Sequence, residues 1–187
     1  MDLRPATPDE LSAVAALINS AYRGEGSRAG WTTEADYIGG QRTDAAILAA
    51  DLAANPRATL RVMRDAPGEA LLGCVWLEPA EPGVWYLGLL TVRPDLQARQ
   101  LGRTLLAAAE AFAAGQGAER MRMTVVNIRD TLIAWYERRG YALTGERRPF
   151  PYDQLVFGAP QRPDLEFVVM EKTLPAQAAT ETIVPCS

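Results

Sequence analysis

The stretch WYLGLLTVRPDLQARQLGRTLL, residues 85–106, decides how this chain folds. Its first eight residues are apolar and rich in β-prone side chains, which indicates a buried strand that ends before Pro94. From Leu101 onward the apolar residues recur at helical spacing. The stretch therefore predicts a strand, a proline-marked turn and a helix.

The segment between strand and helix carries residues that suit an anion. The first backbone N–H groups of a helix lack intrahelical partners and carry the positive end of the helix dipole, so they bind phosphate well. Arg99 and Arg103 add positive charge, and Gly102 lets a ligand approach the main chain. A phosphate-bearing ligand is therefore expected at this helix start.

Two segments resemble one known family. LLTVRPDLQARQLGRTLL is similar to the acyl-CoA-binding motif of the GNAT N-acetyltransferases, L-x-V-x-P-x-x-Q/R-x-x-G-x-G/A. The segment IAWYERRGY, residues 133–141, resembles the family's A-x-x-x-Y-E-K-x-G-F ending of the fourth helix. Gln100 stands where the first motif glycine is usual, and we expect it to be accommodated with a negative φ. The motif matches are Leu90, Val92, Pro94, Gln97 and Gly102.

The remaining patterns agree with this family's order of elements. Strands and helices alternate as strand, two helices, two or three antiparallel strands, helix, strand, helix and two strands. We predict an α+β fold: a GNAT-like, mixed, mostly antiparallel seven-stranded sheet flanked by about four helices, splayed between strands four and five. One domain should cover 1–174, followed by a tail at 175–187. Residues 70–77 are expected to be a strand and 78–83 a connection, and Asn127 is expected to cap the fourth helix.

Composition excludes several classes of protein. The 187 residues are 48% apolar and 22% charged with a net charge of −4, so a single globular domain without a nucleic-acid partner is expected. The only two cysteines, Cys74 and Cys186, give no disulfide framework, which favours the cytoplasm. We find no export leader or membrane-spanning stretch, and the lack of histidine removes the usual base and zinc ligand, so no metal is expected.

The resemblance also implies a cosubstrate, acetyl-CoA, and the residues that hold it. The main-chain N–H of Leu90 would face the thioester oxygen, and main-chain groups of Leu90 and Val92 would pair with pantetheine. Tyr136 matches the family tyrosine that donates a proton to the leaving thiolate. Asn127 resembles a polar residue that contacts cofactor or substrate. The full set expected to bind acetyl-CoA is Leu90, Thr91, Val92, Gln97, Ala98, Arg99, Gln100, Leu101, Gly102, Arg103, Thr104, Asn127 and Tyr136.

The group that takes the proton of the amine is left open. Many family members carry a glutamate four residues before the position of Leu90, but this chain has Tyr86 there. Glu34, Glu78 or Glu81 are alternatives that would act through water, and in a further alternative the amine loses its proton to a chain of waters. Of the three acids Glu34 is preferred, because aromatic residues lie near it in sequence. The residues expected to bind the acceptor are Tyr22, Trp31, Glu34, Tyr86 and Arg148.

These residues predict an acetyl-CoA-dependent N-acetyltransferase acting on the primary amine of a small molecule by direct attack in a ternary complex. Two alternatives stay open: acetylation of a protein N-terminus or lysine, and a non-catalytic acyl-CoA-binding sensor. A homodimer is a further expectation.

Overall fold

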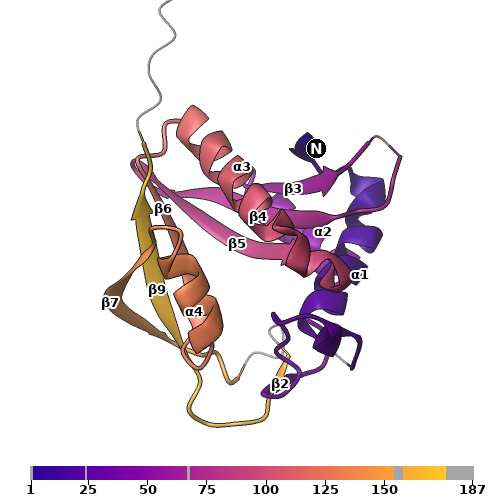
Figure 1. Ribbon diagram of the computed structural model, residues 1–187, viewed down its shortest axis with the longest axis vertical. Coiled ribbons are helices and arrows are strands. Elements are labelled where there is room, and N and C mark those ends of the chain that lie inside the picture. The colour runs from indigo at the N-terminus through magenta and orange to yellow at the C-terminus, as the bar shows by residue number, and fades with distance from the viewer. Residues whose placement is uncertain (1, 24, 67, 154–157, 176–187) are drawn as a thin grey trace, which may run out of the picture.

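A seven-stranded mixed sheet organises the molecule (Figure 1). The computed structural model describes residues 2–23, 25–66, 68–153 and 158–175. The strand order is β1-β3-β4-β5-β6-β9-β7, and all neighbours are antiparallel except β5 and β6. The strands are β1 (Asp2–Pro5), β3 (Thr59–Arg64), β4 (Gly73–Glu81), β5 (Val84–Val92), β6 (Arg120–Val126), β7 (Ala142–Pro149) and β9 (Glu166–Thr173).

Helices cover both faces of this sheet. They are α1 (Leu11–Tyr22), α2 (Ala45–Ala54), α3 (Leu101–Gly115) and α4 (Asp130–Glu137). A short 3₁₀ turn, η1 (Pro8–Glu10), leads into α1 with a capping box between Thr7 and Glu10. Asp44 caps α2, because its side chain accepts a hydrogen bond of 2.8 Å from the Ile47 N–H.

The alternation along β4 decides which helices lie on which face. Cys74 and Trp76 belong to the core that holds α1 and α2, whereas Val75 and Leu77 belong to the core under α3 and α4. Successive side chains of a strand point to opposite faces, so one strand anchors both layers. This confirms the predicted α+β fold with a parallel pair in a mixed sheet.

The sheet opens where β5 and β6 separate. The two strands pair only at Val84–Tyr86 against Arg120–Arg122, and Figure 1 shows the two halves of the sheet diverging from that end. Beyond this point β5 has a bulge against β4, since its register shifts between Cys74 and Trp76. Leu89 lies in the bulge with φ of +48°, an unusual value for a residue with a Cβ. The splay predicted between the fourth and fifth strands of the sequence is therefore present, between β5 and β6.

Three local expectations differ from the structure. β4 runs on through Glu81, so residues 78–81, expected as part of a connection, belong to the strand. Arg129 and not Asn127 precedes α4; the Asn127 amide bonds instead to Asp164 O and Glu166 N, joining β6 to the segment before β9. A two-stranded sheet of β2 (Ile38–Gly39) and β8 (Ala159–Pro160) was not expected.

The tail predicted at 175–187 lies outside the described residues apart from Pro175. No helix within the described part of the chain is long and apolar enough to cross a membrane.

Candidate active site

Two cavities meet at the splay between β5 and β6. The larger has a volume of about 610 Å³ and lies between the diverging strands, and the narrower has a volume of about 240 Å³ and leads to the start of α3. The two cavities share lining residues, so a ligand in one cavity can meet a ligand in the other at these residues. The residues that line both cavities are Tyr22, Leu90, Arg129, Leu132 and Tyr136.

Side chains hold the bulge of β5 at this wall. The Tyr22 hydroxyl donates to Leu90 O at 2.8 Å, and the Thr91 hydroxyl donates to Leu89 O at 2.9 Å. The carbonyl of Val92 likewise accepts a bond of 3.3 Å from the Gln97 amide. Internal donors thus already use the carbonyls of Leu90 and Val92 that we expected to pair with pantetheine, although each oxygen has a second lone pair.

The narrower cavity opens at the N-terminus of α3. Gln100, Gly102 and Arg103 line it there, where the first N–H groups of a helix attract anions. Gln100 has φ of +61°, so our expectation of a negative φ is wrong. The left-handed conformation costs about 1–2 kcal/mol for a residue with a Cβ. A methyl group on Gly102 would lie 3.4 Å from the Trp135 ring, so this position is already close-packed.

Arginines make the mouth of the narrower cavity electropositive. Arg139 stacks over the Trp135 ring at 3.6 Å, and its buried Nε has no hydrogen-bond partner among the described residues. Burial lowers the pKa of Arg139, and the nearby charges of Arg138 and Arg103 lower it further. A cluster of like charges whose buried donor lacks an acceptor suits an anionic ligand such as a phosphate.

Gln97 has a different task from the one predicted. It lines the narrower cavity, but its amide oxygen accepts from the Trp31 N–H at 2.9 Å and its NH₂ donates to the Thr32 hydroxyl at 2.8 Å. Both ends of the amide are therefore engaged with the loop before β2. Gln97 positions that loop beside the helix start.

The predicted acetyl-CoA residues divide between the cavity wall and its surroundings. Asn127, at the end of β6, closes a turn as described above, and Leu101 is part of the buried core. Ala98 and Arg99 belong to the 3₁₀ helix η3 (Pro94–Arg99), and Thr91 and Thr104 bond to backbone carbonyls. Those that line the narrower cavity are Leu90, Val92, Gln97, Gln100, Gly102, Arg103 and Tyr136.

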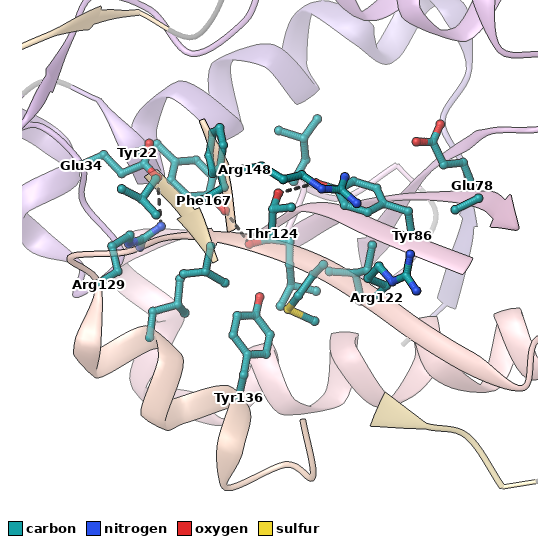
Figure 2. Close-up of a pocket in the computed structure, with 18 of the residues that line it drawn as sticks. Tyr22, Glu34, Glu78, Tyr86, Arg122, Thr124, Arg129, Tyr136, Arg148 and Phe167 are labelled. Carbon is teal, nitrogen blue, oxygen red and sulfur yellow. Dashed lines mark hydrogen bonds and ion pairs between the residues drawn. The ribbon is translucent and has the colours of Figure 1, made fainter. Parts of the chain in front are cut away.

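Tyr136 is the aromatic residue at the junction. It lies on α4, is 5% exposed, and faces both cavities; Figure 2 shows its hydroxyl pointing into the larger one. Burial raises the pKa of Tyr136 above its ordinary value. The hydroxyl therefore stays protonated near neutral pH.

Glu34 forms a buried ionic cluster with two arginines. Its carboxylate pairs with Arg23 on one oxygen and with Arg129 Nη1 at 3.0 Å on the other, and Arg129 also donates to Thr32 O at 2.8 Å. Burial would raise the pKa of Glu34, but the charges of Arg129 and Arg23 outweigh it, so the pKa is lowered. A carboxylate with both oxygens in ion pairs is a weak proton acceptor, which is at odds with the base expected at this residue.

The other predicted acceptor residues lie in different places. Tyr86 and Arg148 line the larger cavity, and the Tyr86 hydroxyl bonds to the Thr124 hydroxyl at 2.9 Å across the splay (Figure 2). Arg148 pairs with Glu146 at 2.7 Å. Trp31 is 43% exposed and lines the narrower cavity, next to Trp135. Trp31 thus lies on the side expected to hold the cosubstrate.

Sequence reasoning missed several wall residues. Arg129 lies between an apolar strand and the helix that begins at Asp130, and no local pattern marks it as buried. Trp135 lies on α4 and Arg139 follows four residues later, just past the end of the helix, and this is the spacing at which side chains meet on a helical turn. Within the described residues no group of three or more Cys, Asp or Glu side chains is placed to hold a metal ion.

Comparison with known proteins agrees with this geometry. Residues 14–141 match the family model described as the acetyltransferase (GNAT) family. The chain belongs to the GNAT acetyltransferase family. A search of curated proteins finds no match.

Solved GNAT structures share the fold. A ribosomal-protein-alanine N-acetyltransferase from Brucella melitensis is 20% identical with a TM-score of 0.65, over 93% of this chain and 100% of that one. A nourseothricin acetyltransferase is 22% identical with a TM-score of 0.53, over 64% of this chain and 67% of that one. A GNAT acetyltransferase from Staphylococcus aureus is 11% identical with a TM-score of 0.64, over 93% and 99%. At these identities the likeness shows the fold and leaves the acceptor open.

Proposed function

We propose that this protein is an acetyl-CoA-dependent N-acetyltransferase that transfers an acetyl group to a primary amine of a small molecule in a ternary complex. The observation that carries the proposal is the pair of cavities that share one wall at the β5 bulge. The narrower cavity suits the cosubstrate and the larger one the acceptor, so the two would meet at Leu90 and Tyr136.

The residues of the narrower cavity fit coenzyme A. A diphosphate requires donors and positive charge, and the start of α3 with Arg103 and Arg139 supplies both. When bound, acetyl-CoA supplies a thioester that can pass its acetyl group to a neutral amine. The aromatic and apolar side chains farther in, Trp135, Leu132 and Val92, suit an uncharged arm.

The chain would assist the transfer at two points. The main chain at Leu90, held by Tyr22, would offer its N–H to the acyl oxygen as that oxygen gains charge. The Tyr136 hydroxyl would donate its proton to the departing sulfur. Neither task needs histidine, which this chain lacks.

Binding and turnover test the proposal separately. Calorimetry with acetyl-CoA at micromolar concentration should show binding, and free thiol should appear when a panel of small amines is added. Tyr136→Phe should lower kcat by about 100-fold, within the range for loss of a general acid, with acetyl-CoA affinity unchanged. Absence of binding would refute the proposal, whereas binding without thiol release would favour the sensor alternative. Peptides with a free N-terminus or lysine in the same panel test the protein-acceptor alternative.

A further inference from the structure

Three carboxylates line the larger cavity, and they differ in what already binds them. They are Glu34, Glu78 and Glu81. Under the proposed function an acceptor ammonium must lose a proton before its nitrogen can attack, so the site needs a proton acceptor. No histidine is available. The partners of each carboxylate decide which one fits.

Two of the three are neutralised by arginines. Glu34 pairs with both Arg23 and Arg129 in the protein interior. Glu81 accepts from Arg122 at 2.7 Å at the end of β4. The two arginines lower the pKa of Glu34, so this carboxylate is a weak proton acceptor. Glu81 has a side chain that is 54% exposed, and it lies at the outer end of β4 with Arg122 as its partner.

Glu78 has a neutral partner instead. Among the described residues its carboxylate has a single hydrogen-bond partner, the side-chain amide of Asn55 just after α2. An amide donor orients a carboxylate without supplying a positive charge. Besides the charged residues of the larger cavity already named, Arg42 and Asp51 line a cavity together with Glu78. The half-buried Glu78 thus keeps an oxygen for the cavity, at the end away from the Glu34–Arg129 pair (Figure 2).

The position of Glu78 follows from the length of β4. Because β4 continues to Glu81, Glu78 lies directly opposite Tyr86 on β5, and paired residues of neighbouring strands present their side chains on the same face. Tyr86 stands four residues before Leu90, and four residues of extended strand span about 13 Å at most. Glu78, opposite Tyr86, is therefore about this far along the sheet from the bulge. Intervening water has to carry the proton over part of this distance.

We infer that Glu78 is the group that accepts the proton from the acceptor ammonium, an assignment that rests on the proposed function. One N–H bond of the ammonium breaks and an O–H bond forms on Glu78, which passes the proton to solvent before the next turnover. The nitrogen keeps the electron pair and becomes the neutral nucleophile. Asn55 is the positioning residue for this carboxylate.

A pH profile tests the assignment. Steady-state kcat would be measured by thiol release between pH 6 and 10 for wild type, Glu78→Gln, Glu81→Gln and Glu119→Gln. Glu119→Gln is a control on the exposed turn before β6. At pH 7, Glu78→Gln should lower kcat by about 100-fold. The loss should shrink as the pH approaches the pKa of the substrate amine, because solvent then deprotonates it. Glu78→Asp should recover part of the rate, and the calorimetric Kd for acetyl-CoA and the Tm should stay as in wild type.

Three results would overturn the assignment. The first is a Glu78→Gln rate equal to wild type at pH 7, and the second is a loss that is the same at every pH, which would mean substrate binding or packing. The third is a pH-dependent loss of kcat in Glu81→Gln and not in Glu78→Gln. If wild type binds acetyl-CoA but releases no thiol with any amine, the proposed function fails too, and the wild-type measurement alone identifies that failure.

Discussion

Replacing Glu34 with Gln should destabilise the protein strongly, because one buried carboxylate serves two buried arginines. The side chains of Glu34, Arg23 and Arg129 are 9%, 4% and 8% exposed. Removing one partner from a buried ion pair costs about 3–5 kcal/mol, since the remaining charge keeps its desolvation cost. Gln has nearly the same shape as Glu, so the lost free energy of unfolding reports the removed charge and not a change in packing. For a domain of this size the Tm should fall by about 6–20 °C.

Urea unfolding followed by tryptophan fluorescence measures this loss. The matched control is Asp36→Asn, whose partner Arg28 is 2.5 Å away in an exposed pair. Exposed pairs contribute about 0–1 kcal/mol, so this variant should stay close to wild type. Equal stability of Glu34→Gln and wild type at pH 7 would refute the view that Glu34 is a structural anion.

The pH dependence gives the same variant a second readout. The pKa of folded Glu34 is lowered from the ordinary 4.5, so its stabilisation is complete above that value and is lost as the pH falls through the folded-state pKa. The difference in free energy of unfolding between wild type and Glu34→Gln should therefore become smaller as the pH falls. If this difference in free energy stayed constant down to the pH at which the wild type unfolds, protonation of Glu34 would not be coupled to folding and the prediction would be wrong.

Three further predictions concern the cavity walls. Gln100→Gly should raise the free energy of unfolding by about 1 kcal/mol by relieving the left-handed backbone, and a lower value in urea unfolding would contradict this. Tyr22→Phe removes the donor to Leu90 O, so kcat in the thiol assay should fall about 10- to 100-fold as the bulge shifts, and an unchanged kcat would show that the bond does not position the site. Arg139→Ala should weaken acetyl-CoA binding in calorimetry about tenfold, with a smaller effect at high salt; equal affinity would place the phosphates elsewhere.

Local patterns in the sequence determined the elements around the site. The alternation and helical spacing that predict β5, α3 and α4 act over a few residues. β5 and α3 form where expected, whereas α4 begins at Asp130 and not directly after Asn127. The resemblance of the two motifs to the family implied that Leu90, Gly102 and Tyr136 contact the cosubstrate, and all three line the narrower cavity. The sequence alone thus determined the family, the fold and where the cavity opens.

Only the tertiary structure decided the state of the charged groups. Glu34 meets Arg129 across 95 positions of chain, and no local pattern reports such a pair or the pKa shift that follows from it. The same holds for Glu78, which lines the larger cavity because β4 extends past its expected end, and whose partner Asn55 lies just after α2. The proton affinity of a carboxylate depends on the charges packed around it, and the fold brings those charges together from distant segments.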